Sequence, residues 1–382
     1  MTRSANFALV ALFLVAVGMR SQLSGLPPLL PQVESEFGAS HSWSGFLLSL
    51  SFVTMGIGAL AASTALRSIG SVRGITLMTL VIVLSGIARA AAPNALVVTA
   101  VGIPLGLATG LQTALLPVVT KERFRQFATS VYVIGISVGS GLALAAAAPI
   151  AAAIGGWRPA VLTFAAVTGL LTVPWLFVRR HSDTSETGVQ RRYRWRHPAA
   201  AAAVPIAIFS LQSALFFGLS TWLPSAYIEH GWTATSAGLL ASGLLVSSLV
   251  GSAAIAPLTR SPESTVRWLI VAALAAVVAS FGLVVLPDAA SAWAALAGAS
   301  TGALLVLSLK LPLELYESAA DVAALSGLML AFGYWTGGAA PFVLGVLRDA
   351  SGTFNTSFAA LGVVSLMLVV ISVRLTTRSR AT

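Results

Sequence analysis

Twelve long apolar segments, separated by short polar or Gly- and Pro-containing interruptions, make up most of this 382-residue chain. Each segment reaches the length of about 20 residues that a helix needs to cross a bilayer. Only 9% of the residues are charged and 57% are hydrophobic, which excludes a soluble globule, in which about 25% are charged. The sequence therefore predicts an all-α membrane protein whose twelve transmembrane helices cover residues 6–32, 43–66, 73–92, 94–118, 127–153, 158–178, 198–223, 232–259, 266–287, 291–315, 321–347 and 354–375.

The distribution of the cations predicts how the chain lies in the bilayer. An even number of spans places both termini on one side. Of the 22 Lys and Arg residues, Arg89, Arg158 and Arg348 fall on the opposite side, and Arg20 and Lys310 fall within spans, which leaves 17 on the side of the termini. Loops rich in Lys and Arg stay in the cytoplasm. We therefore expect both termini in the cytoplasm of a bacterial cell with the protein in the inner membrane, and the +10 balance requires no nucleic-acid partner.

The longest polar stretch divides the chain almost in half. We predict a six-helix bundle over 1–178, a basic cytoplasmic linker over 179–197 and a second six-helix bundle over 198–382. Glycines and prolines of the two halves match in order at offsets of 193 and then 192 residues, which indicates an internal repeat. The matches are Pro31 with Pro224, Gly38 with Gly231, Gly45 with Gly238, Gly106 with Gly298, Gly110 with Gly302, Gly135 with Gly327, Gly141 with Gly333, and Pro149 with Pro341. Two related six-helix halves are a transporter architecture, with the substrate site at the midplane.

Several segments resemble the cyanate-permease and 2-nitroimidazole-transporter family within the major facilitator superfamily. They are MRSQLSGLPPLLPQV, ALLPVVTKERF, GGWRPA, LQSALFFGLSTWLPSAYIEHGWTATSAGLLAS and LSGLMLAFGYWTGGAAPFVLGVLRDASG. The resemblance runs over most of the chain. It implies the major facilitator fold of two pseudo-symmetric bundles, and a cavity lined by the first, fourth, seventh and tenth spans.

Arg20 lies near the middle of the first span, where a charge costs at least about 2.5 kcal/mol. No acidic residue lies at the middle of any predicted span, so no carboxylate is available to pair with Arg20. We therefore expect the substrate to be the anion that pairs with Arg20, held by the guanidinium fork. Ser24 is expected on the same helical face at i+4, whereas Gln22 is turned about 200° away and is expected to bond a neighbouring helix. A structural arginine bonded to backbone carbonyls is the alternative.

Lys310 is the other cation within a span. It lies about two turns from the cytoplasmic end of the tenth span, close enough for its ammonium to reach the interface. A second positive charge in the cavity is the competing interpretation, and it would let one anion bridge the two halves.

The resemblance directs attention to amide side chains on the fourth and seventh spans, Gln112 and Gln212. Gln212 shares a helical face with Phe209 and Phe216, a mixture of amide and aromatic groups that suits a small planar solute. An interhelical hydrogen bond is an equal alternative for each Gln.

Two further groups complete the predicted site. Tyr334 and Trp335 fall at the middle of the eleventh span, away from the interfacial belts where aromatic residues collect, so we expect one of them to face the cavity. Pro27, Pro28 and Pro224 weaken symmetry-related outer ends of the first and seventh spans and are predicted to gate the outside.

The sequence also argues against other classes of protein. The string Gly135 to Gly139 matches G-x-S-x-G, but no predicted span contains a His base, so an enzyme is not expected. No filter-like loop or ring of charges indicates a channel, no Walker A string indicates ATP, and no metal site or other cofactor is expected. We predict a monomeric carrier of a small anion that works by alternating access. The alternative is an exporter of neutral or weakly acidic heterocycles.

Overall fold

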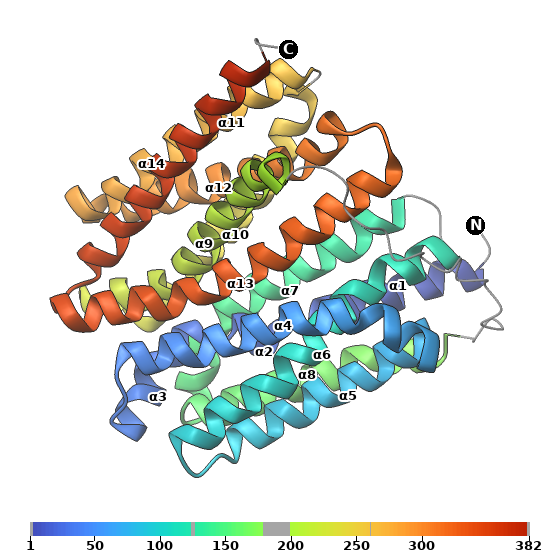
Figure 1. Ribbon diagram of the computed structural model, residues 1–382. Helices are drawn as coiled ribbons and strands as arrows, with labels where there is room; N and C mark the ends of the chain where they lie inside the picture. The colour runs from blue at the N-terminus through green and yellow to red at the C-terminus, as the bar shows by residue number, and fades with distance from the viewer. Residues whose placement is uncertain (1–2, 124–126, 179–198, 260, 380–382) are drawn as a thin grey trace. The chain divides into compact units, whose positions relative to one another are not determined.

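The structure, a computed structural model, describes residues 3–123, 127–178, 199–259 and 261–379 (Figure 1). All the regular secondary structure in those ranges is helical, and twelve stretches are long and apolar enough to cross a membrane. The predicted all-α fold with twelve transmembrane helices is confirmed. The predicted linker, 179–197, lies outside the described ranges.

The helices differ from the predicted spans mainly in how the first span is divided. In chain order they are α1 Arg3–Gly18, α2 Ser21–Ser24, η1 Pro27–Leu29, α3 Leu30–Phe37, α4 His41–Ile69, α5 Ser71–Ala90, α6 Ala95–Arg123, α7 Phe127–Ile154, α8 Trp157–Leu176, α9 Ala199–Glu229, α10 Ala234–Ile255, η2 Ala256–Leu258, α11 Pro262–Val285, η3 Pro287–Ala289, α12 Ala290–Leu315, α13 Ala319–Ser351 and α14 Phe354–Ser379.

Backbone contacts divide the chain into two compact units. Unit 1 consists of Met1–Ala39, Leu50–Gln190 and Tyr227–Ser242, and unit 2 of Ser40–Ser49, Arg191–Ala226 and Gly243–Thr382. Each unit thus contains most of one half of the sequence and a short segment from the other. The predicted boundaries at 178 and 198 stay a prediction.

The two short segments, Ser40–Ser49 in unit 2 and Tyr227–Ser242 in unit 1, are each hydrogen-bonded to the unit in which they lie. In unit 2, the Ser42 backbone N–H donates to Asp349 Oδ2 at 2.7 Å, and Ser49 Oγ accepts from the Phe342 N–H at 3.0 Å. In unit 1, Ser242 Oγ donates to the Gly141 carbonyl at 2.8 Å. These bonds tie the start of α4 to α13, and the start of α10 to α7.

The first span is not the uninterrupted helix that the sequence predicted. α1 ends at Gly18, α2 is a single turn, and η1 begins with Pro27 and Pro28, which cannot donate helical hydrogen bonds. Arg20 lies in the first break, directly before α2. The break ends at Arg20, and the Ser24 N–H donates to the Arg20 carbonyl at 2.9 Å, so the i+4 spacing of Arg20 and Ser24 lies within one helical turn.

Three pairs of glycines make matching close contacts in the two halves of the sequence. A Cβ atom added to any of them would clash with a backbone carbonyl oxygen of another helix, so these helices pack backbone to backbone. The pairs are Gly58 on Leu107 and Gly251 on Ala299, Gly106 on Ser51 and Gly298 on Leu244, and Gly110 on Met55 and Gly302 on Ser248. Every residue lies 192 or 193 positions from its counterpart. The α4–α6 contact of unit 1 is thus repeated as α10–α12 in unit 2, which supports the predicted repeat.

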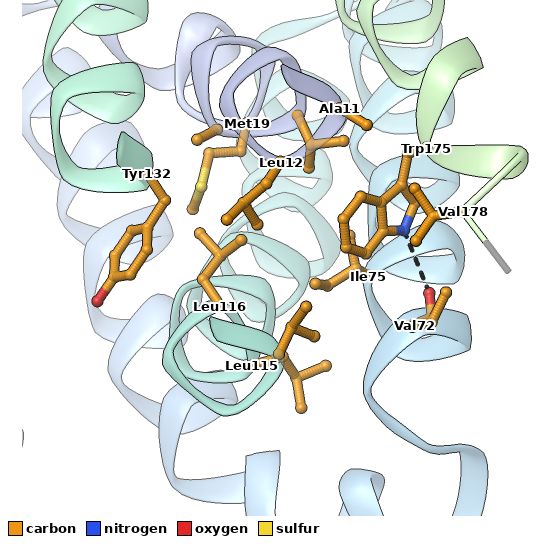
Figure 2. Packing of buried hydrophobic residues seen from close by; sticks show 13 residues of the cluster. Ala11, Leu12, Met19, Val72, Ile75, Leu115, Leu116, Tyr132, Trp175 and Val178 are labelled. Carbon is orange, nitrogen blue, oxygen red and sulfur yellow. Dashed lines mark hydrogen bonds between the residues drawn. The ribbon is translucent and has the colours of Figure 1, made fainter. Parts of the chain in front are cut away.

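A buried apolar cluster in unit 1 holds the end of the first helix. In this unit α1 packs against α7 and α8, and α5 against α6 and α8. Met19 points from the break into the cluster, toward Leu12 and Leu116 (Figure 2). At the other side of the cluster the Trp175 indole N–H donates to the Val72 carbonyl at 3.4 Å. The packing of Met19 anchors the chain immediately before Arg20.

Candidate functional site

Arg20 is presented by the break between α1 and α2. Its carbonyl accepts hydrogen bonds from the N–H groups of Leu23 at 3.1 Å and Ser24 at 2.9 Å, which start the short α2 turn. The side chain is partly exposed, and its buried Nε has no hydrogen-bond partner among the described residues. The alternative of a guanidinium bonded to backbone carbonyls therefore finds no support in this part of the chain.

Hydroxyl groups from α2 and α8 bind the carbonyl at which α1 ends. Ser21 Oγ donates to the Gly18 carbonyl at 2.8 Å, and Thr168 Oγ1 donates to the same oxygen at 3.0 Å. The two hydroxyl oxygens are also 2.9 Å apart, although Ser21 and Thr168 are 147 positions apart in the sequence. These bonds stabilise the helix end that Arg20 follows.

Gln22 makes the interhelical contact that the sequence predicted. Its Nε2 donates to the Val161 carbonyl of α8 at 3.0 Å, and Gly86 of α5 leaves room for its amide. The Gln22 Oε1 atom is buried without a hydrogen-bond partner among the described residues.

Arg89 is the residue that the sequence reasoning missed, because it was counted only as an orienting charge. It lies one position before the end of α5, is 0% exposed, and donates from Nη1 to the Gln22 carbonyl at 3.2 Å. Its Nε and Nη2 atoms are buried without a partner in the described structure. Two signals could have found it: Arg89 falls inside the predicted span 73–92, and Gly86 lies about one turn before it.

The loop formed by the GGWRPA segment holds the helix ends around this region. Arg158 and Glu36 form an ion pair of 2.6 Å, and the Trp157 indole N–H donates to the other Glu36 oxygen at 2.6 Å. Arg158 Nη1 also donates to the Ala90 carbonyl at 2.6 Å, at the end of α5. This motif of the resembled family has a structural use here, since it joins α3, α5 and α8.

Both predicted glutamines are buried and bonded within their own unit. Gln112 Nε2 donates to Thr79 Oγ1 of α5 at 3.1 Å, and Gln212 Nε2 donates to the Thr301 carbonyl of α12 at 3.3 Å. Ser213 Oγ also donates to Gln212 Oε1 at 3.4 Å. These contacts favour the interhelical interpretation that the sequence left open.

The predicted aromatic residues of unit 2 keep exposed surface. Phe216 and Tyr334 are partly exposed, and Trp335 is 40% exposed and meets Phe332 edge to face at a centroid distance of 5.7 Å. Phe209, seven positions before Phe216 in the continuous α9, is buried in an apolar cluster.

Lys310 lies in a polar cluster that joins α12, α11 and the segment after η2. Its ammonium donates to the Thr259 carbonyl at 2.6 Å and to Thr259 Oγ1 at 2.8 Å, and lies 3.9 Å from Glu314 Oε1. Glu314 in turn accepts from Thr265 Oγ1 at 2.6 Å. Arg20 has no such set of partners in the described structure, so these two cations have different surroundings.

The prolines predicted to gate the outside occupy different settings. Pro27 and Pro28 are buried in the irregular stretch that separates α2 from α3, whereas Pro224 is buried inside the continuous α9. The predicted residues thus divide between the units. Arg20, Ser24, Gln112 and the first two prolines belong to unit 1, and the other predicted site residues belong to unit 2.

The family of the chain follows from a match that spans three quarters of its length. Residues 9–300 match the model described as Major Facilitator Superfamily. The chain belongs to this superfamily. Like other members of the Major Facilitator Superfamily it is a multi-pass membrane transporter of small solutes and not an enzyme.

Known proteins of the superfamily resemble the chain over nearly its whole length. The 2-nitroimidazole transporter of Escherichia coli (strain K12) is 25% identical over 95% of this chain and 93% of its own length. The cyanate transport protein CynX of the same strain is 27% identical over 94% of this chain and 95% of its own. The predicted family is confirmed.

Solved structures agree on the fold. A bacterial homologue of the human lysosomal transporter Spinster, in an inward-facing and unoccupied conformation, has a TM-score of 0.77 at 15% identity and covers 97% of each chain. The nucleoside transporter NupG has a TM-score of 0.80 at 12% identity, over 96% of this chain and 99% of its own. At such identities the likeness concerns the fold alone.

Proposed function

We propose that the protein is a secondary carrier of a small anionic solute, with Arg20 as the group that binds the anion. The observation that carries this proposal is the partly exposed Arg20 side chain at a helix break, with a buried Nε that has no partner among the described residues. An intramembrane charge is retained at a cost, and it most often faces a substrate pathway. A guanidinium fork suits a carboxylate-like or linear anion.

Cyanate, which gives the relative CynX its name, is a small linear anion of this kind. Movement by alternating access of two half-bundles is part of the proposal, as is a substrate site near the midplane. The proposal also includes the predicted orientation, with both termini in the cytoplasm, and a monomeric state of the carrier.

Of the remaining predicted residues, some keep a place in the proposed site. Ser24 follows Arg20 in α2, and Phe216, Tyr334 and Trp335 retain the exposed surface that contact with a solute requires. Gln112, Gln212 and Lys310 already have protein partners, so in the proposal they hold the helices of their own unit together.

A second candidate is an exporter of neutral or weakly acidic heterocycles. The specific observation in its favour is the exposed aromatic surface of Phe216, Tyr334 and Trp335, on which a planar ring could stack. The 2-nitroimidazole transporter among the relatives has a substrate of this shape.

Binding measurements on the purified full-length protein separate the two candidates. Small monovalent anions (cyanate, nitrate and formate) and 2-nitroimidazole are tested against wild type, Arg20→Gln and a matched control, Arg267→Gln. Arg267 is an exposed arginine of α11. The anion proposal expects at least one anion to bind wild type and the control equally and Arg20→Gln about 100-fold more weakly, as for the loss of a charge-assisted contact. Wild type that binds only 2-nitroimidazole, with Arg20→Gln unchanged, would contradict it.

A further inference from the structure

Arg89 is a fully buried cation beside the helix break that presents Arg20. Its Nη1 donates to the carbonyl of Gln22, a residue two positions after Arg20 and therefore within about 7 Å of it along the backbone. The bond of Arg158 to the Ala90 carbonyl fixes the end of α5 next to Arg89. The guanidinium of Arg89 is thus held by its bond to Gln22, and its backbone by the bond between Arg158 and Ala90.

The hydrogen bond alone does not account for a charged residue at this place. One of the donors of Arg89 is used, while its Nε and Nη2 are buried without a partner, and no carboxylate pairs with it among the residues that the structure describes. A neutral amide could donate the same bond without the cost of a buried charge. Since Arg is protonated at every physiological pH, the charge persists.

Two like charges near one short turn of helix raise that cost further. Arg20 directly precedes α2 in the sequence, and Arg89 of α5 contacts α2 through the carbonyl of Gln22. Both side chains have buried nitrogen atoms without a hydrogen-bond partner in the described structure. An anion bound at Arg20 offsets both charges in a medium of low dielectric constant. The free-energy cost of keeping these two charges unpaired is thereby offset when the anion binds.

We infer that Arg89 is a specificity-determining residue of the anion site: a buried, fixed positive charge that favours anions over neutral solutes without touching them. It holds the carbonyl of Gln22 and adds its potential to that of Arg20, which makes the contact with the substrate. This inference rests on the proposed function, because it names a second cation for the same site.

Substitutions that keep or remove the charge test the inference. The neutral variants are Arg89→Gln, which retains a donor, and Arg89→Met, which suits an apolar interior; Arg89→Lys keeps the charge, and Arg267→Gln is the control. Affinity for the anion that binds wild type and for 2-nitroimidazole is measured on each purified protein, together with the melting temperature without and with saturating anion.

We expect the neutral variants to bind the anion about tenfold more weakly, with their affinity for 2-nitroimidazole changed by less than about twofold. Without ligand they melt at or above the wild-type temperature, because an unpaired buried charge is gone, and the anion stabilises them less. Arg89→Lys keeps most of the anion affinity.

A merely structural Arg89 gives the opposite pattern. Neutral variants that melt lower without ligand, yet bind the anion as wild type does, would overturn the inference, as would loss of folding in both. Failure of the proposed function appears elsewhere, in wild type without anion binding or in Arg20→Gln with undiminished anion affinity.

Discussion

The first and seventh spans are related by the internal repeat, yet they fold differently. α9 runs without interruption from Ala199 to Glu229, although it contains Pro205 and Pro224. The first span is divided into α1, α2, η1 and α3. At the offset of 193 that matches Pro31 with Pro224, the counterpart of Arg20 is Ser213, whose Oγ donates to the carbonyl of Phe209 in its own helix at 2.8 Å.

α5 and its counterpart α11 also differ, because α5 has a buried charge and α11 has an apolar residue at the matching position. Val72, Arg73 and Pro93 match residues of the second half at an offset of 194, which places the buried Leu283 where α5 has Arg89. The close backbone contacts therefore recur in both halves, whereas Arg20 and Arg89 are matched by Ser213 and Leu283 in the second half, and α9 is not divided as the first span is.

The largest effect is expected where both halves make the same backbone contacts, if a methyl group is added to a glycine at the contact of α4 with α6 or of α10 with α12. Gly110→Ala and Gly302→Ala should each destabilise the protein by about 3 kcal/mol, because the new Cβ meets the carbonyl oxygen of Met55 or Ser248. Thermal unfolding in detergent measures the loss. Gly141→Ala and Gly327→Ala are the controls, since nothing lies within 4 Å of a Cβ at either position. A large loss in only one half would show that the packing is not repeated.

The counterparts Arg20 and Ser213 test the part that is not shared. Arg20→Gln should weaken anion binding by about 2.7 kcal/mol, the loss of a contact between a charge and an anion. Ser213→Ala should change it by less than about threefold, because the hydroxyl binds its own helix. Equilibrium binding of the anion to the purified proteins gives both values. Equal effects would mean that the two halves contribute alike to the site.

Removal of one remote hydroxyl should loosen the break itself. Thr168→Val deletes the donor to the Gly18 carbonyl and should cost about 1 kcal/mol of stability and several-fold in anion affinity. Thr172→Val is the matched control on the same helix, since Thr172 donates only to the carbonyl of Thr168. If the two variants were indistinguishable in melting temperature and anion affinity, the hydroxyl would have no part in holding the break.

The smallest effect is expected at Pro28 and Pro224, two of the prolines predicted to gate the outside. Pro28→Ala and Pro224→Ala should change the transport rate by about threefold while leaving the affinity of the anion unaltered, if these positions bend during the transport cycle. Initial uptake rates and equilibrium binding, measured on the same preparations, separate the two quantities. Wild-type rates in both variants would remove the prolines from gating.

Much of the fold could be predicted because its causes are local or repeated. A run of about 20 apolar residues partitions into the bilayer wherever it occurs, and Gly110 and Gly302 recur because the same helix contact is made twice. The interhelical bond of Gln22 was predicted from its helical position, about 200° away from Arg20. Arg89 was not recognised, because it was counted only as an orienting charge although it falls inside the predicted span 73–92, and the sequence does not show that α5 ends against α2.

The sequence by itself determined the membrane-spanning helices, the repeat and the presence of a cation in the first span, since hydropathy and charge are properties of the segments themselves. Only the tertiary structure decided that this span breaks at Arg20. Beside the break, Thr168 of α8 and Arg89 of α5 bind the carbonyls of Gly18 and Gln22. A helix ends where its backbone groups find other partners, and here most of those partners lie far away in the chain.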